Sequence, residues 1–368
     1  FAQQKGGAMS PLDDIPMLKR LGNALVSYAA YLVETLYPKG LAVFHPYPAE
    51  IAAWQLLGSA VLILCATVLV VRYRKSCPYA FVGWFWYLGM LVPVIGVVQV
   101  GMQAMADRYT YIPLVGIFIL LTWGAADLAE RIGLRKSALT AVAGLVFAAI
   151  VTATWVQVSY WQNSVILFEH ALAVTSGNYL AHANLGVALN RMGRGQEAAS
   201  HYLEAIRINP NYSSPHYNLA NYYAARGDKE QAYRHYQEAV RIRPDYANAY
   251  NNLGVLLASQ GRFEEAASQY EKALRIEPAN AGFHYNCGVA LANQGRLSEA
   301  AAQFRDALVL RPNYAEAHND LGKVLMTEGR PEEAASHFRE AVWLKPNFTE
   351  ARRNLDTALE SQKKQGKK

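Results

Sequence analysis

The sequence has few cysteines and little net charge in its second half, and both shortages exclude classes of protein. Cys65, Cys77 and Cys287 lie in unrelated contexts, so neither a disulfide framework nor a metal site is predicted. The net charge of +6 comes mainly from basic loops in the first half and from the terminal KKQGKK, whereas residues 177–346 carry nearly equal numbers of acidic and basic side chains. We therefore predict no nucleic-acid partner.

The amino-terminal end also lacks the features of a signal peptide. Residues 1–14 contain no basic segment followed by an apolar one, and the chain begins at Phe1 rather than methionine. We expect the chain to be the carboxyl part of a longer protein. Residues 15–37 predict a largely apolar helix, but its charged side chains favour a helix at the outer membrane face over a span. Residues 1–50 are thus predicted to form an external loop with an interfacial helix.

Long apolar runs dominate the rest of the first half. Residues 51–71 contain no charged side chain, and about 20 apolar residues suffice to cross a bilayer core of roughly 30 Å. Similar stretches follow, two of them interrupted by prolines that membrane helices tolerate. The four predicted transmembrane helices are 51–71, 79–100, 109–127 and 137–158.

Basic loops predict the orientation of these spans. The loop after the first span contains Arg72, Arg74 and Lys75, and the loop after the third contains Arg131, Arg135 and Lys136. The positive-inside rule places both loops in the cytoplasm. Because four spans return the chain to its starting side, the second half faces outward. We predict an integral protein of the bacterial inner membrane with a periplasmic second half, or a lumenal one in a eukaryote.

A 34-residue period fills the second half of the chain without an insertion. In each unit a Leu-Gly pair or near equivalent precedes an alanine and an aromatic residue, as in Leu253-Gly254 followed by Ala266 and Tyr270. This length and pattern predict tetratricopeptide repeats (TPR), pairs of antiparallel helices whose apolar faces are buried by stacking. The predicted units are 177–210, 211–244, 245–278, 279–312 and 313–346.

The predicted fold class is therefore all-α, a transmembrane helix bundle followed by an α-solenoid. Residues 159–176 predict a junction helix, in which Phe168 and Ala171 lie one period before Tyr202 and Ala205. We expect this helix to pack on the first repeat and to hold the solenoid against the last span. Residues 347–368 predict a capping helix and a basic tail.

A polar series recurs in the first helix of every repeat. It consists of Asn184, Asn218, Asn252, Asn286 and Asp320. On the concave face, a carboxamide offers both a donor and an acceptor to the backbone of an extended peptide. The series is either a peptide-binding ladder or a row that solvates the groove and bonds between repeats.

A second series, of histidines, shares another repeat position. Its members are His182, His216, His284 and His318. Each histidine is at least one repeat from the next, too far to share a metal ion, so its predicted role is packing.

Three segments carry a family resemblance: LKRLGNALVSYAAYLVETLYPKGLAVFHPYP, LVPVIGVVQVGMQAMADRYTYIPLVGIF and WQNSVILFEHALAVTSGNYLAHANLG. Together they resemble the carboxyl half of bacterial relatives of the transmembrane-and-TPR O-mannosyltransferases, which are GT-C glycosyltransferases. The polar series resembles the asparagine ladder of the nucleocytoplasmic O-GlcNAc transferases, which grips acceptor polypeptide.

This resemblance implies sugar transfer from a polyprenyl-phosphate donor to a docked polypeptide on the outer side. A divalent cation is a candidate cofactor of the full-length enzyme, and none is expected in this fragment. In the GT-C class the catalytic carboxylate lies in the first external loop, and this chain begins after it. We therefore expect no catalytic residue here and an inactive fragment.

Asp107, Arg108 and Tyr109 are the candidates for a contact with the donor phosphate. Arginine can bind a phosphate through two hydrogen bonds, and aspartate can orient it or bind a divalent ion. The same residues also fit a helix end anchored among lipid headgroups. His45, in the run FHPYP, either faces the donor or is structural.

Two functions remain open at this point. The chain is the carboxyl part of a membrane glycosyltransferase whose repeats dock a polypeptide acceptor, or it is a non-catalytic membrane-anchored scaffold for protein–protein interaction in envelope or polysaccharide-export assembly. In both cases the predicted partners are membrane lipid and a protein or peptide in the groove.

Overall fold

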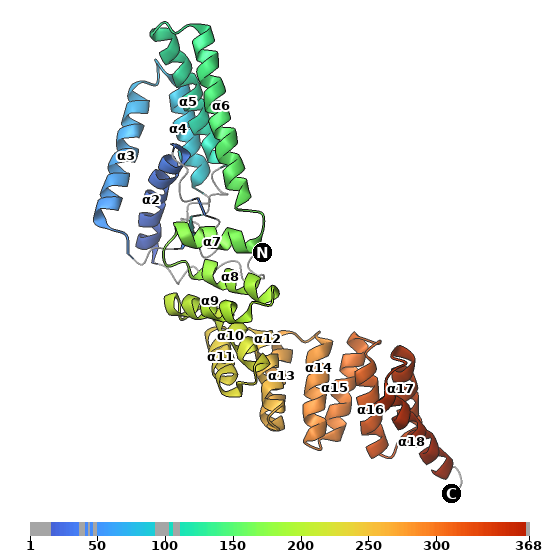
Figure 1. Cartoon of the computed structure of the whole chain (residues 1–368). Helices are drawn as coiled ribbons and strands as arrows, with labels where there is room; N and C mark the ends of the chain where they lie inside the picture. Colours follow the sequence, from blue (N-terminus) through green and yellow to red (C-terminus); the bar gives the residue numbers. More distant parts are fainter. Residues whose placement is uncertain are drawn as a thin grey trace. The chain divides into compact units, whose positions relative to one another are not determined.

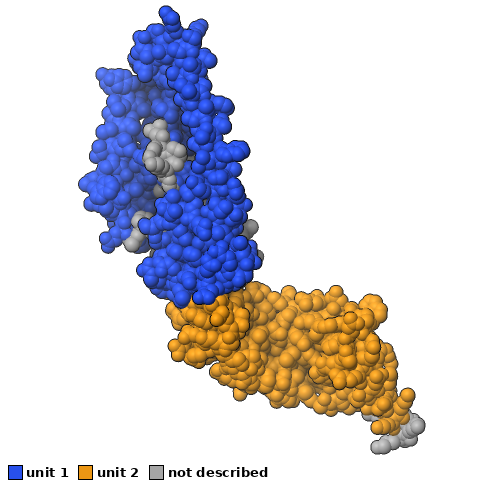
Figure 2. Space-filling view, in the orientation of Figure 1, with its two compact units in different colours: residues 1–210 blue, residues 211–368 orange. Residues whose placement is uncertain are grey.

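A computed structural model describes residues 16–36, 41–42, 45–46, 50–92, 103–105 and 111–365. The chain forms two compact units, Phe1–Pro210 and Asn211–Lys368, which Figure 2 distinguishes by colour. Apart from turns and one short two-stranded ribbon, the described residues are helical (Figure 1). The predicted all-α fold is therefore confirmed.

Apolar helices make up most of the first unit. They are α2 (Met17–Leu36), α3 (Ala53–Arg72), α4 (Pro78–Leu91), α5 (Tyr111–Arg131) and α6 (Lys136–Ser159). Within the described residues, α3, α5 and α6 are long and apolar enough to cross a membrane. At 1.5 Å per residue, the 20 residues of α3 extend about 30 Å. The expected span 79–100 begins in α4, but residues 93–100 lie outside the described part, so its full extent stays a prediction.

The helix α2 packs along α3 and α4 within this unit. The Tyr28 hydroxyl donates a hydrogen bond to the Leu88 carbonyl (2.7 Å), and the Tyr87 hydroxyl donates to the Tyr28 carbonyl (2.6 Å). Tyr31, Tyr87 and Leu91 form a buried core between these helices. The helix at 15–37 is therefore partly buried among its neighbours, and its depth in a membrane stays a prediction.

The helices α4 and α5 cross with their backbones in contact. A Cβ atom added to Gly83 or to Gly116 would lie 2.3 Å from the carbonyl oxygen of the other residue. Small residues permit such close approaches between membrane helices. Only glycine at both positions allows this crossing.

The first repeat belongs to the same unit as the apolar helices. The junction helix α7 (Ser164–Val174) packs on α8 (Tyr179–Arg191), which pairs with α9 (Gly195–Ile208). Ala171 and Ala181 are buried together with Ala42. The His170 Nε2 atom also lies 3.2 Å from the Leu41 carbonyl oxygen. The junction helix therefore joins the first hairpin to the segment that follows α2.

The second unit contains the remaining repeats as successive helix pairs. They are α10 (Ser213–Ala225) with α11 (Lys229–Ile242), α12 (Ala247–Ala258) with α13 (Phe263–Ile276), α14 (Ala281–Asn293) with α15 (Leu297–Leu310), and α16 (Ala315–Thr327) with α17 (Pro331–Leu344). The last helix, α18 (Thr349–Gln365), covers α17 and buries Ala351 and Ala358 completely. It occupies the place of the predicted cap.

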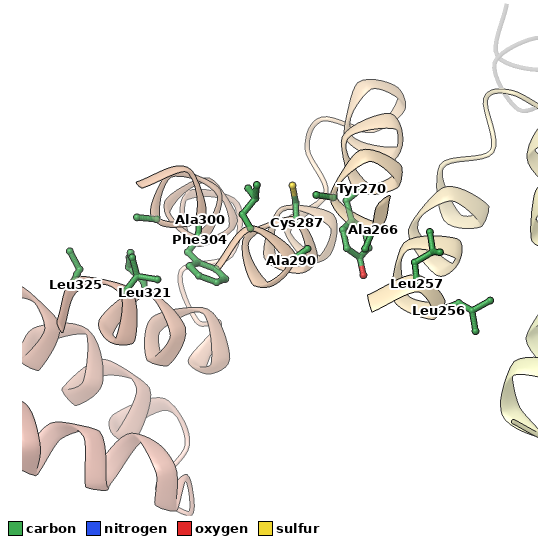
Figure 3. Packing of buried hydrophobic residues seen from close by; sticks show 14 of the residues in the cluster. Leu256, Leu257, Ala266, Tyr270, Cys287, Ala290, Ala300, Phe304, Leu321 and Leu325 are labelled. Atoms are coloured by element: carbon green, nitrogen blue, oxygen red, sulfur yellow. The ribbon is translucent and has the colours of Figure 1, made fainter. Parts of the chain in front are cut away.

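A continuous apolar core runs through these pairs, and part of it appears in Figure 3. Each buried aromatic ring of the second helix lies against the small residue of the first. A Cβ atom added to Gly288 would lie 2.7 Å from Phe304 Cε1. At the hairpin turns, Gly261 and Gly295 adopt φ +76°, a backbone conformation that glycine adopts at little cost. The repeated glycines therefore serve both packing and turning.

Candidate functional site

The predicted polar series lies on the first helix of each repeat, but its members differ in exposure. Asn184 is exposed on α8 in the first unit. In the second unit, Asn218, Asn252, Asn286 and Asp320 are half-buried on α10, α12, α14 and α16. None of the five side chains is fully buried, so each has surface that a ligand can contact.

Three members of the series also bond to the preceding repeat. The Asn252 amide donates to the Tyr217 hydroxyl oxygen (3.1 Å) and to Asn221 Oδ1 (3.0 Å). The Asn286 amide donates to Asn251 Oδ1 (2.9 Å). These bonds join the first helices of neighbouring repeats, which is one of the two roles that the sequence left open.

The fourth and fifth repeats continue the same arrangement. The Tyr285 hydroxyl donates to Asp320 Oδ2 (2.9 Å), and burial raises the pKa of Tyr285, which keeps the hydroxyl a neutral donor. The Asn354 amide donates to Asn319 Oδ1 (2.9 Å), and Asn319 itself is 1% exposed. In each case a polar residue bonds to the residue 35 positions later. These partners form a second polar row on the first helices, made up of Tyr217, Asn251, Tyr285 and Asn319. The sequence analysis missed this row, although its 34-residue spacing is visible in the sequence.

A shallow cleft of about 220 Å³ opens beside Asp320. Its walls come from α14, α15 and α16, and they combine apolar with polar side chains. They include Val289, Asn293, Leu297, Phe304, Asp320, Lys323, Val324 and Thr327. Lys323 Nζ lies 3.0 Å from Asp320 Oδ1 and 3.3 Å from Glu350 Oε1. Charged groups of both signs therefore lie together at one edge of the cleft. The cleft thus presents hydrogen-bond donors, acceptors and an apolar surface side by side.

The short ribbon of the first unit precedes the candidates for a donor contact in the sequence. Strand β1 (His45–Pro46) pairs antiparallel with β2 (Gln103–Met105), and His45 is opposite Met105. Asp107, Arg108 and Tyr109 follow β2 directly in the chain but lie outside the described residues. Their predicted role is therefore still a prediction.

The histidine series has partners that sequence reasoning also missed. His182, His216 and His318 each meet a histidine of the second helix of the same hairpin, 19 residues later. In the fourth repeat, His284 Nδ1 lies 2.8 Å from Gln303 Oε1 instead. The predicted packing role is thus incomplete, because each ring also makes a polar contact.

Comparisons with known proteins confirm the repeats. The TPR repeat family matches residues 220–261 and 256–295, and tetratricopeptide repeat families match 166–213, 201–234 and 285–347. The fold and these matches therefore define a tetratricopeptide-repeat protein that also carries helices of membrane-spanning length.

Its curated relatives include O-mannosyltransferases. Protein O-mannosyl-transferase Tmtc2 of Drosophila melanogaster is 31% identical over 113 residues, which are 31% of this chain and 12% of the relative. Protein O-mannosyl-transferase F38B6.6 of Caenorhabditis elegans is 24% identical over 160 residues, which are 43% of this chain and 23% of the relative. The chain thus matches less than a quarter of either relative and is distantly related to both.

A third relative and two solved structures are also similar to part of this chain. Inactive TPR repeat-containing thioredoxin TTL3 of Arabidopsis thaliana is 35% identical over 63 residues, 17% of this chain and 9% of the relative. YrrB, a TPR protein with an unusual peptide-binding site, has TM-score 0.47 and 20% identity over 50% of this chain and 96% of that one. MamA of Desulfovibrio magneticus RS-1 has TM-score 0.44 and 23% identity over 47% and 97%.

Proposed function

We propose that the chain is the carboxyl part of a membrane glycosyltransferase that uses a polyprenyl-phosphate-linked sugar, with repeats that dock an extended polypeptide acceptor. The observation that carries this proposal is that one chain combines apolar helices of membrane-spanning length, tetratricopeptide repeats and a sequence match to two O-mannosyltransferases. Because the matched part is a small share of those relatives, transferase activity belongs to the complete protein.

The orientation of the first unit supports an outward-facing docking domain. The helix α3 ends at Arg72, and α5 ends at Arg131, directly before α6 begins at Lys136. Both basic turns lie at the same end of the apolar helices, and α7 begins at the other end of α6 (Figure 1). If the basic end is cytoplasmic, the first repeat stands on the opposite side of the membrane. That side is the periplasm or the lumen of the secretory pathway.

The polar series of the second unit supports acceptor docking. A peptide that carries hydroxyl groups must reach the sugar donor in an extended form, and its backbone then needs both donors and acceptors from the protein. The half-buried Asn252 and Asn286 provide both kinds of group, and Asp320 and Lys323 add charges. The bonds between repeats hold these side chains in place before a peptide arrives, which reduces the entropy cost of binding.

Donor binding is proposed for the residues that follow the ribbon. Arg108 would contact the lipid-linked phosphate, with Asp107 as its partner or as a ligand for a divalent cation of the complete enzyme. Tyr109 would lie at the membrane interface beside them. The ribbon supports the proposal, because it pairs His45 with a residue two positions before Asp107.

Peptide docking is tested with the full chain in lipid nanodiscs. The probe is a fluorescent extended peptide rich in serine and threonine, and binding is followed by fluorescence anisotropy. We expect the double variant Asn252→Ala/Asn286→Ala to weaken binding at least tenfold, which is about 1.4 kcal/mol. The control is Asn319→Ala, which removes a buried bond between the last repeat and α18 and should leave peptide affinity unchanged. Equal affinities for the double variant and the unchanged chain would refute docking in this groove.

Sugar transfer is tested separately, in membranes that contain the complete protein, polyprenyl-phosphate mannose and the same peptide. We expect the peptide to become mannosylated, and we expect less mannosylated peptide from the Arg108→Ala variant. Peptide binding without transfer from any polyprenyl-phosphate sugar would instead support the scaffold function.

A further inference from the structure

Three repeat hairpins hold a pair of histidines in the same geometry. The pairs are His182 with His201, His216 with His235, and His318 with His337. Their Nδ1 atoms lie 3.0, 3.1 and 3.0 Å apart, and the ring centroids lie 5.3 Å apart in all three pairs. One ring comes from each helix of the hairpin, so the packing of the hairpin sets the distance between them.

This distance suits two nitrogen ligands of one metal ion. Nitrogens at about 2.0–2.1 Å from an ion lie about 2.9 Å apart at a right angle and about 3.4 Å apart at the tetrahedral angle. The observed separations fall between these values. For both Nδ1 lone pairs to converge on one ion, each ring must turn by about 35–45° from the line that joins the two nitrogens.

The outer nitrogen of His318 is already held in the way that metal-binding histidines are held. Its Nε2 atom lies 3.0 Å from the Pro312 carbonyl oxygen. Because a carbonyl only accepts, Nε2 carries the proton and the Nδ1 lone pair faces His337. Neutral imidazole is the form that binds metals.

A carboxylate accompanies each pair. Glu204, Glu238 and Glu340 follow the second histidine by three residues, which places them on the same face of the second helix. The third repeat has no histidine pair and has Lys272 at the carboxylate position, where its Nζ lies 5.7 Å from the centre of the Tyr250 ring. The acidic residue is thus present in every hairpin that has a histidine pair, and the hairpin that has neither histidine has a lysine there.

We propose that each of the three histidine pairs binds one divalent transition-metal ion, such as Ni²⁺, Zn²⁺ or Cu²⁺, through its two Nδ1 atoms. No group of three or more His, Cys, Asp or Glu side chains is poised around a metal in the part of the chain that the structure describes. Water therefore completes the coordination, together with the carboxylate after a change of rotamer. The ion bridges the two helices of one hairpin and stabilises the repeat against opening.

The test uses Ni²⁺ and the full chain in detergent micelles at pH 7.5, with isothermal titration calorimetry and visible absorption. The variants His201→Gln, His235→Gln and His337→Gln each remove one ligand. They copy the natural His284–Gln303 contact, so the hairpin keeps a hydrogen bond. We expect each variant to lose one bound Ni²⁺, and the triple variant to lose all three.

A gain of binding provides the complementary test. The fourth hairpin already has His284, whose Nε2 atom lies 2.9 Å from the Pro278 carbonyl oxygen, and it has Asp306 at the carboxylate position. The substitution Gln303→His should therefore add one Ni²⁺ site. The control Gln269→His pairs with Tyr250 and should add none. The proposal is overturned if the unchanged chain binds no Ni²⁺ at millimolar concentration, or if the triple variant binds as many ions as the unchanged chain.

Discussion

Replacing Gly288 by alanine tests the packing rule that the repeats share. The added Cβ would lie 2.7 Å from Phe304 Cε1 and 2.8 Å from Cδ1, whereas carbon atoms in contact lie about 3.5–4.0 Å apart. The Phe304 ring is 1% exposed, so it cannot move without disturbing the core. Overpacking of this kind costs about 1–3 kcal/mol, and alanine gains about 1 kcal/mol over glycine within a helix. We expect a net loss of about 0–2 kcal/mol.

A double-mutant cycle separates these two effects. The cycle combines Gly288→Ala with Phe304→Leu, because leucine lacks the outer ring atoms that the new methyl group would meet. The helix-propensity gain is the same with either partner, so the coupling energy reports the clash. We expect a coupling of about 1 kcal/mol or more, measured as opening free energies from amide hydrogen exchange in α14 and α15 of the full chain.

A second glycine in α14 gives the matched control for that cycle. A Cβ at Gly282 would meet only Asn280 Oδ1, at 3.4 Å. Gly282→Ala should therefore leave the α14 and α15 amides as protected as before, or more so. If Gly288→Ala and Phe304→Leu have additive effects, the close approach is not what requires glycine at this position.

Three further predictions follow from the contacts. Burial, and then the neighbouring His216, lower the pKa of His235 to about 4. The unfolded chain therefore takes up this proton first, and stability should fall as the pH drops from about 6.5 to about 4. Because the ring is partly exposed, we expect a loss of about 1–2 kcal/mol, measured by hydrogen exchange in α10 and α11. Gly116→Ala should separate α4 from α5 and lower the melting temperature in detergent, since the new Cβ would lie 2.3 Å from the Gly83 carbonyl oxygen. Asn319→Ala should cost about 1–3 kcal/mol, measured by hydrogen exchange in α16 and α18, because it removes a buried hydrogen-bonding group.

Each of these predictions has a control within the chain. The His235→Gln variant should lose most of the pH dependence in α10 and α11, and an unchanged slope would contradict the assignment to His235. Gly124→Ala should be tolerated, because the nearest atom to its added Cβ is 3.9 Å away. Asn354→Ala should cost less than Asn319→Ala, because Asn354 is only half-buried. The reverse order would contradict the role given to Asn319.

Local periodicity was enough to predict the helices and their pairing. Within each helix the apolar residues recur at spacings of one or two turns, as Ala266 and Tyr270 do, and backbone hydrogen bonds act over the same range. The turns were predictable for the same reason, because Gly261 needs a backbone angle that other residues rarely adopt. Long apolar runs likewise predicted α3, α5 and α6 as helices of membrane-spanning length.

The polar contacts between and within repeats depended on tertiary structure. Whether Asn286 faces a peptide, solvent or Asn251 depends on how far one repeat is rotated against the next, and no residue near Asn286 in the chain determines that rotation. The pairing of His318 with His337 likewise needs the crossing angle of the two helices in its hairpin. The sequence by itself determined the repeats and the apolar helices, because their pattern is local. Only the tertiary structure decided which polar side chains meet, because those meetings result from the stacking of whole helices.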